Sequence, residues 1–221
     1  KIKTKKNVFL VILTLFLSSF SLVACGNSTN TEIQKYRKTE KQENSNNQQD
    51  IDPLFKKAQN LFDQDKYEDA YKIFKQLADQ GDTKSQNALG SLYVHGKGVK
   101  QDYEKAYTYF VKAMDKNVPE AINSIGFMYF NGFYFERDLK KACEYYEKSA
   151  NLDYGLGAAN TANCYYEGWI EIKDKKKYFD YSLKAAEKNY GPSQFNVAVM
   201  YKKGEVIDRS MTKAVYWYEK A

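Results

Sequence analysis

The strongest constraint on the fold is a period of 36 residues that runs through residues 83–221 without a gap. Small residues, glycines and aromatic residues each recur at equivalent positions, 36 residues apart. They are Gly90, Gly126, Ala162 and Ala198; Tyr93, Tyr129, Tyr165 and Tyr201; Gly96, Gly132, Gly168 and Gly204; and Tyr109, Tyr145, Tyr181 and Trp217. A fixed period of about 20–50 residues is typical of arrays in which each unit packs on its neighbours. The sequence therefore predicts a repeat array.

Each unit has the pattern of two helices. In the first unit, Leu89 and Tyr93 fall on one face of a helix predicted from about Thr83 to Val94. Gly96 stands where a helix C-terminal glycine is expected, and Asp102 where the next helix needs an N-cap. The buried side of that second helix carries Ala106, Tyr109, Phe110 and Ala113. The small residue at position 90 predicts a close approach of the two helix backbones, with the following Tyr covering the contact.

The residues of the first unit resemble the Sel1-like repeat, a relative of the tetratricopeptide repeat. The matching residues are Leu89, Gly90, Leu92, Tyr93, Gly96, Gly98, Val99, Asp102, Lys105, Ala106, Tyr109, Phe110, Lys112 and Ala113. The resemblance covers four units, and residues 53–82 match the tetratricopeptide pattern loosely. The third unit departs most, because Tyr178 and Ser182 replace the alanine and an aromatic residue and the second glycine is missing.

This resemblance implies an all-α fold, a right-handed α-solenoid of antiparallel helix pairs. The implied units are a tetratricopeptide-like helix pair at 53–82 and Sel1-like repeats at 83–118, 119–154, 155–190 and 191–221, the last one incomplete. The resemblance also implies a scaffold or adaptor that binds a protein or peptide, with no shared catalytic residue to carry over. The last unit ends without a polar capping helix, so we expect either further chain or a partner over its end.

The N-terminal segment has the pattern of an export signal. A basic stretch precedes an apolar run over residues 8–20, which is short for a membrane span. Leu22-Val23-Ala24-Cys25 resembles the bacterial lipobox, which implies a signal peptide at 1–24 and lipidation of Cys25. An ordinary signal peptide with a chance cysteine is the alternative. Polar residues 25–52 are expected to form a disordered tether.

The expected location is the cell envelope, with the chain anchored to a membrane by lipid. Gly26 is not the Asp that typically retains a lipoprotein in the inner membrane of Gram-negative bacteria. We therefore expect the outer membrane, facing the periplasm, where such a membrane exists.

Charge and composition exclude several classes of function. Beyond the first 24 residues the chain carries 30 basic and 28 acidic residues, which is not the balance of a nucleic-acid binder. His95 is the only histidine, and no nucleophile lies in a recognisable pattern with a base and an orienting group. The sequence therefore predicts no enzyme, no cofactor and no metal site. The lysine-rich segment 173–177 is expected to be a solvated turn, and attraction to anionic head groups is the alternative.

A partner is expected on the concave face, which the first helix of each unit lines in this architecture. Its outward positions are Asn87, Ser91 and Val94; Asn123, Phe127 and Phe130; Ala159, Asn163 and Tyr166; and Phe195, Val199 and Lys202. Only one of these residues is charged, whereas a solvated face would be mostly charged. The alternative is that neighbouring helices bury part of this stripe.

Two cysteines fall at core positions of the repeat, Cys143 in the second unit and Cys164 in the third. They are either two small buried hydrophobic residues or a disulfide formed after export. The function expected from all these features is a non-enzymatic binding scaffold of the bacterial envelope, and one version is an immunity protein against an envelope-targeting effector. The alternative is an enzyme acting on cell-wall or β-lactam substrates.

Overall fold

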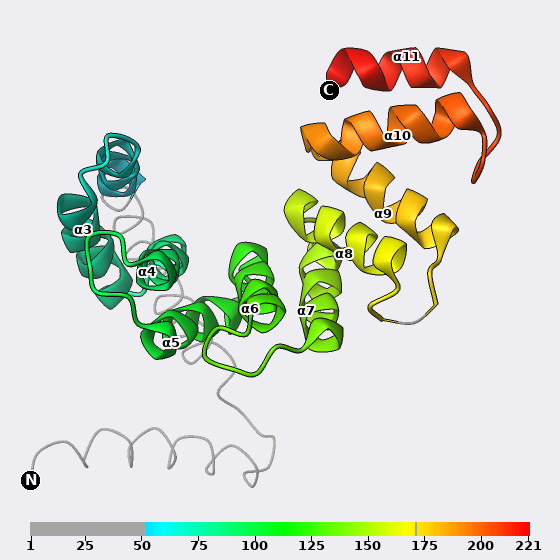
Figure 1. Ribbon diagram of the computed structural model, residues 1–221. Coiled ribbons are helices and arrows are strands. Elements are labelled where there is room, and N and C mark those ends of the chain that lie inside the picture. The colour runs from blue at the N-terminus through cyan, green and yellow to red at the C-terminus, as the bar shows by residue number, and fades with distance from the viewer. Residues whose placement is uncertain (1–51, 171) are drawn as a thin grey trace, which may run out of the picture. The chain divides into compact units, whose positions relative to one another are not determined.

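The computed structural model describes residues 52–170 and 172–221, which belong to one compact unit. The expected signal peptide, the lipidated Cys25 and the tether up to residue 51 lie outside the described residues. The described part contains ten helices and no strand, and successive helices run antiparallel (Figure 1). The prediction of an all-α array of helix pairs is therefore confirmed.

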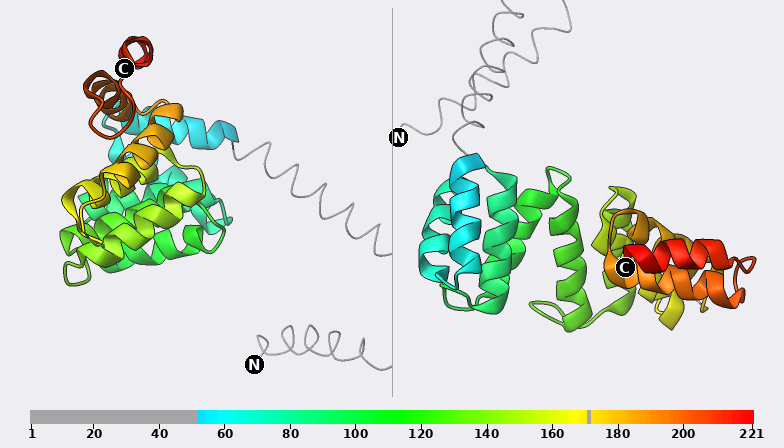
Figure 2. Two further views of the ribbon diagram at one scale, coloured as in Figure 1. Left: turned by 90° about the vertical axis from the view of Figure 1, so that its right-hand side faces the viewer. Right: turned by 90° about the horizontal axis from the view of Figure 1, so that it is seen from above.

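The helices follow the 36-residue register. After a helix at 52–63 come α3 (Tyr67–Asp79), α4 (Thr83–His95), α5 (Tyr103–Met114), α6 (Pro119–Asn131), α7 (Leu139–Asn151), α8 (Gly155–Glu167), α9 (Lys175–Glu187), α10 (Gly191–Lys203) and α11 (Met211–Lys220). We call α4, α6, α8 and α10 the A helices, and α5, α7, α9 and α11 the B helices. Figure 2 shows the pairs following one another in chain order. None of the described helices is long and apolar enough to span a bilayer.

Local chemistry sets the ends of the helices in each repeat. The carboxylates of Asp102, Asp138 and Asp174 each accept the backbone N–H three residues later, at distances of 2.9–3.0 Å. Such N-caps contribute about 1 kcal/mol each to helix stability. Every A helix ends at a glycine in the left-handed region, with φ between 64° and 77°. The expected caps are thus present, and they fix where each A–B loop begins and ends.

The small positions of the first two A helices accommodate an aromatic side chain of the following B helix. A Cβ atom on Gly90 would come within 2.4 Å of the Phe110 ring, and one on Gly126 within 2.8 Å of the Tyr146 ring. The predicted close approach of two backbones is present at Gly126, where the same Cβ would lie 3.0 Å from the carbonyl oxygen of Ala142. The ring that lies on each glycine comes from the B helix, and the sequence pattern did not predict it.

Aromatic stacks and a disulfide connect the helices further. Tyr129 stacks on Tyr145 within the second pair, with ring centroids 5.6 Å apart, and the first and third repeats have equivalent stacks. A disulfide joins Cys143 of α7 to Cys164 of α8, and their Cα atoms are 6.0 Å apart. Both cysteines are fully buried, so of the two alternatives the structure has the bridge. It links one repeat to the next.

The last helix has an open face in the described structure. Val215 and Tyr218 of α11 are 49% and 37% exposed. Cys143 and Phe179, which occupy the position of Val215 in earlier repeats, are buried. An A helix follows each of those earlier B helices, and no described helix follows α11.

Candidate protein-binding surface

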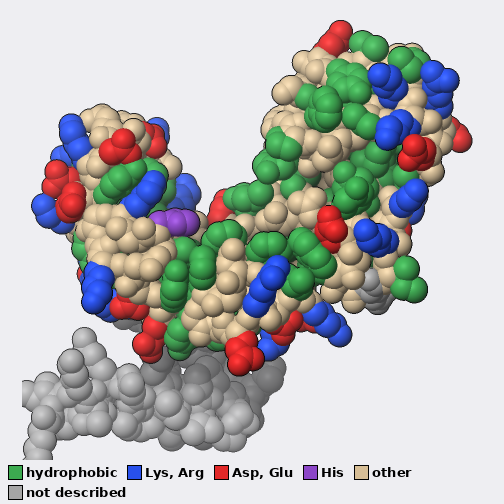
Figure 3. All heavy atoms as spheres, in the orientation of Figure 1, with side chains coloured by type: hydrophobic (Ala, Val, Ile, Leu, Met, Phe, Trp, Pro, Cys, Tyr) green, Lys and Arg blue, Asp and Glu red, His purple; other side chains and the backbone are tan. Residues whose placement is uncertain are grey.

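The A helices supply the predicted binding positions. In Figure 1, α4 and α6 lie on the inner side of the bend of the array and α5 lies on its outer side. Figure 3 shows hydrophobic side chains gathered along the hollowed side of the described part. We call the outward positions on α4, α6, α8 and α10 the A face.

Three large aromatic side chains of the A face are well exposed. Phe127 is 38%, Tyr166 55% and Phe195 53% exposed, and they come from three successive A helices. Asn163 is exposed as well, and the half-buried members are Asn87, Ser91, Phe130 and Val199. The sequence pattern therefore placed most of these residues on an accessible surface.

Val94 and Asn123 do not belong to that surface, and this part of the prediction is wrong. Val94 is only 3% exposed and packs in a core cluster with Tyr93 and Ile125. Asn123 is 7% exposed, and its Oδ1 accepts a hydrogen bond of 2.9 Å from Nδ2 of Asn160 on the next A helix. Ala159 is also buried. Neighbouring helices thus cover part of the predicted outward positions, which is the alternative stated for the sequence.

Hydrogen bonds between successive A helices explain this burial. The Asn160–Asn123 bond joins residues 37 apart, and Oγ of Ser124 donates to Oδ1 of Asn87 across the same interval at 3.5 Å. These polar side chains therefore bind their neighbours in the array. The A face is consequently narrower than the sequence pattern indicates.

Aromatic residues outside the A helices extend the A face. Trp169 of the α8–α9 loop packs on Phe130, and Tyr218 of α11 packs on Phe195, with ring centroids 5.3 Å and 5.6 Å apart. The guanidinium of Arg137 lies 5.5 Å from the Phe130 ring. Sequence reasoning missed Trp169 and Tyr218 because it considered only the A helices.

A cavity of about 660 Å³ opens beside the first A helix. Its apolar lining comes from Phe55, Phe62, Phe74, Ala88, Leu92 and Val118, and its polar lining includes Gln59, Lys84, Asn87, Ser91 and Glu120. Asn87 and Ser91 belong to the A face, so the cavity continues that surface. Sequence reasoning did not find it, because its walls come from several helices and depend on how these helices pack together.

Several titratable groups of the described residues have pKa values shifted by burial or by helix capping. Burial raises the pKa of Tyr93, Tyr146 and Tyr181, so these phenols stay neutral. A hydrogen bond from the Lys105 backbone lowers the pKa of Asp102. The described residues hold no group of three or more His, Cys, Asp and Glu side chains that could bind a metal ion.

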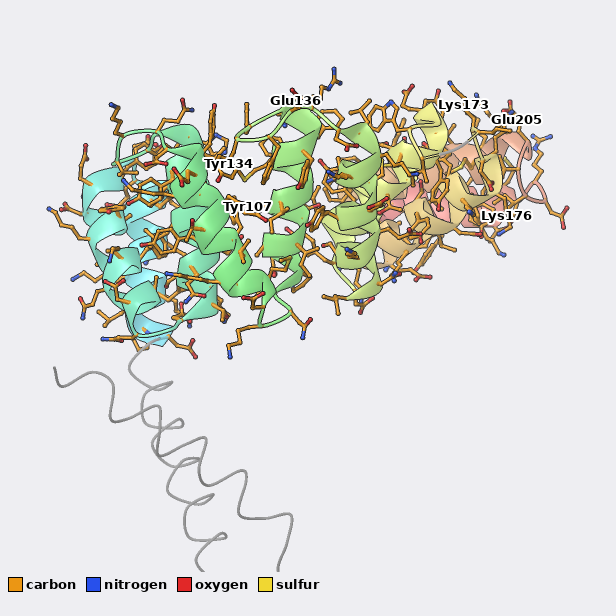
Figure 4. All side chains as sticks on the ribbon, turned by 90° about the horizontal axis from the view of Figure 1, so that it is seen from below. Tyr107, Tyr134, Glu136, Lys173, Lys176 and Glu205 are labelled. Atoms are coloured by element: carbon orange, nitrogen blue, oxygen red, sulfur yellow. A yellow bond between two sulfur atoms is a disulfide. The ribbon has the colours of Figure 1, made fainter. Side chains whose placement is uncertain are left out.

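The glycine-rich loop after α4 has a packing role. A Cβ on Gly98 would come within 2.3 Å of the Tyr67 carbonyl group, so the loop backbone lies directly on the start of α3. Nζ of Lys97 donates to the Tyr67 hydroxyl at 3.1 Å and lies 4.9 Å from the Phe62 ring. In the second repeat, Tyr134 takes the place of Gly98 with φ of 69°, in the region that favours glycine. Figure 4 shows Tyr134 beside Tyr107.

Several solved structures share this fold. A protective antigen of uropathogenic Escherichia coli, c5321, described as displaying an SLR fold, is 28% identical with a TM-score of 0.59 over 70% of this chain and 33% of that one. A Sel1 repeat protein from Oxalobacter formigenes is 23% identical with a TM-score of 0.65 over 75% of this chain and 68% of that one. The immunity protein Pa5087 from Pseudomonas aeruginosa is 21% identical with a TM-score of 0.57 over 77% of this chain and 64% of that one.

The chain thus spans a third of the length of the Escherichia coli antigen and just under two thirds of that of the immunity protein. No curated protein sequence matches it. The model of the Sel1 repeat family matches residues 62–82, 83–118, 119–154, 154–190 and 191–221. Repeats of this family generally serve as non-enzymatic scaffolds for protein interactions. With most of its length matched in this way, the chain belongs to the Sel1 repeat family.

Proposed function

We propose that this Sel1 repeat protein is a scaffold of the bacterial envelope that holds a protein or peptide partner on its A face. The observation that carries the proposal is the exposure of Phe127, Tyr166 and Phe195 on three successive A helices. Exposed hydrophobic groups that gather in a patch are typical of interaction sites, and Figure 3 shows such side chains along the hollowed side of the described part. Large aromatic side chains supply contact area at a small cost in side-chain entropy.

The chemistry of the A face favours a polypeptide as the partner. Lys202 is the only charged residue among its outward positions, and Arg137 and Lys173 lie beside its aromatic rings. Nucleic acid would meet these scattered cations rather than a basic stripe. The cavity beside Asn87 and Ser91 has an apolar lining that could take apolar side chains of a partner. Charged residues of both signs also line it: Asp52, Lys56, Asp63, Lys84 and Glu120. Aromatic anchors beside such a pocket are typical of protein interfaces.

The anchor of the scaffold is part of the proposal. The lipobox-like segment supports export, cleavage before Cys25 and lipidation of its sulfur, and each acyl CH₂ in the bilayer contributes about 0.8 kcal/mol. A Cys25→Ser variant of the full-length protein should therefore move from the membrane fraction to the soluble fraction or stay as uncleaved precursor. A Ser28→Ala variant is the matched control and should stay in the membrane fraction.

Within this function, we propose immunity against an envelope-targeting effector as the specific role. The fold shared with the immunity protein Pa5087 supports this role, together with the expected location outside the inner membrane. The partner would then be a toxic effector that the A face binds and blocks. Production of the protein should protect cells from that effector, and the Tyr166→Asp variant should not protect them.

The experiment for the A face uses capture and affinity measurement with residues 50–221 as bait. Tyr166→Asp and Phe195→Asp should each weaken partner binding by tenfold or more, because each places a charge among desolvated aromatic groups. Tyr216→Asp is the matched control, since Tyr216 is 49% exposed but lies on a B helix. Equal affinities for all three variants would contradict the proposal. Circular dichroism checks that each variant folds.

A further inference from the structure

The loop between α8 and α9 departs from the other A–B loops at two positions of the repeat. Ile172 stands where the other repeats have a charged residue, and Lys175 stands where they have an apolar one. The equivalents of Ile172 are Lys100, Glu136 and Asp208, and those of Lys175 are Tyr103, Leu139 and Met211. The third repeat has thus exchanged apolar and charged residues at its loop and helix start.

Ile172 is the most exposed of the large hydrophobic side chains that the structure describes. It is 90% exposed, whereas the other exposed ones lie between 37% and 55%. It belongs to none of the core clusters formed by the described residues. Packing within the array therefore does not explain an isoleucine at this position.

Lysines follow Ile172 in the chain at positions 173 and 175–177, and Glu171 precedes it. Figure 4 shows Lys173 and Lys176 projecting outward from this part of the array. Lys176 pairs with Asp180, and Nζ of Lys173 lies 5.7 Å from the Tyr166 ring. The one acid between residues 172 and 177 is Asp174, whose carboxylate accepts the N–H of Lys177. Neither Lys173 nor Lys175 forms an ion pair with another described residue.

An exposed aliphatic side chain among lysines is suited to the interface of a lipid bilayer. The apolar group enters the boundary between head groups and acyl chains, while the cations remain near anionic head groups. The interpretation of this segment as a solvated turn accounts for the lysines, but it does not explain an exposed isoleucine at position 172. We propose that Ile172, Lys173 and Lys175 form a contact site for the anionic surface of a membrane. The site does not require lipidation of Cys25. Lys173 lies beside Tyr166 of the A face, so the test is done without any protein partner.

The test uses residues 50–221, which form a compact unit containing every core cluster and lack both Cys25 and the apolar run at 8–20. The protein is sedimented with vesicles of equal parts phosphatidylglycerol and phosphatidylcholine, and with vesicles of phosphatidylcholine alone. We expect binding to the anionic vesicles only, and weaker binding as the salt concentration rises.

Two variants take their residues from the equivalent positions of other repeats. Ile172→Asp should lower the affinity for anionic vesicles about tenfold, and Lys175→Leu about fivefold. Lys100→Gln, at the equivalent loop position of the first repeat, should leave the affinity unchanged. Equal affinities of the parent and Ile172→Asp would overturn the proposal. Failure of the parent to bind anionic vesicles would also overturn it, and would leave an acidic protein surface as the alternative occupant.

Discussion

The ring of Phe110 lies against the backbone of Gly90, so close that a Cβ on residue 90 would be 2.4 Å from the ring. The second repeat has the same relationship between Gly126 and Tyr146. In the third repeat the small residue is Ala162, and the residue equivalent to Phe110 is the small Ser182. In these three helix pairs, glycine on the A helix therefore goes with an aromatic ring on the B helix, and the larger alanine goes with a small residue.

Gly90→Ala should lower the free energy of unfolding by about 1–2 kcal/mol. Alanine gains about 1 kcal/mol of helix propensity, but the added methyl group overpacks the contact with Phe110 at a larger cost. Urea unfolding measures the change, and Ser91→Ala on the same helix is a control that should shift the stability by less than about 0.5 kcal/mol. A more stable Gly90→Ala variant would show that propensity, rather than packing, governs this position.

The same contact predicts coupling between two substitutions. Phe110→Leu should be destabilising by itself, because it removes a fully buried ring. In the double variant Gly90→Ala/Phe110→Leu, the smaller side chain makes room for the new methyl group. The double-mutant cycle should therefore give a favourable interaction energy of about 0.5–2 kcal/mol. Strict additivity would mean that the two residues do not contact each other in solution.

The disulfide between Cys143 and Cys164 should stabilise the array. It closes a loop with a sequence separation of 21 residues, for which the loss of unfolded-chain entropy corresponds to about 3 kcal/mol. Replacement of both cysteines by alanine should cost about this much in urea unfolding, and reduction should destabilise the parent protein but not the variant. Intact mass with and without reductant counts the bridge directly. Two free thiols in the oxidised protein after unfolding would refute it.

Buried tyrosines predict a loss of stability in alkali. Burial raises the pKa of Tyr93, Tyr146 and Tyr181 above the usual tyrosine value of about 10. Above that pH the unfolded chain releases these protons more readily than the native protein, so it binds fewer protons and the stability falls as pH rises. Below about pH 10 both states keep the protons and this contribution is constant. Melting temperatures measured from neutral pH to pH 11 check the trend.

Tyr146→Phe tests the origin of that alkaline loss. Tyr146 is almost fully buried, and phenylalanine keeps the ring that packs on Gly126. The variant should therefore lose less stability per pH unit above about pH 10 than the parent does. Identical slopes for the two proteins would assign the alkaline loss to other groups.

Much of the fold could be predicted from signals in the sequence. The 36-residue register is visible because the same residue types recur along the chain. The caps at Asp102, Asp138 and Asp174 and the glycines that end the A helices are visible because each acts within a few residues of its own position. The family pattern then supplied the order of the helix pairs. These features depend little on how one repeat is placed against the next.

The binding surface was harder to predict, because contacts between repeats define it. Whether an outward position is exposed depends on the neighbouring A helix, as the hydrogen bond between Asn123 and Asn160 illustrates. Val94 is buried for the same reason. The cavity beside Asn87 has walls from the helix at 52–63, α3, α4 and the start of α6, so it depends on how these helices pack together. A single helix pattern does not contain this information.

Site-specific photo-cross-linking to the captured partner tests the central claim, that the A face holds a protein, most directly. A benzophenone side chain is placed at residue 166 in one sample and at residue 216 in another, positions that are 55% and 49% exposed and lie on an A and a B helix. Binding on the A face should give a covalent adduct with the partner from residue 166 and none from residue 216. An adduct from residue 216 alone would contradict it.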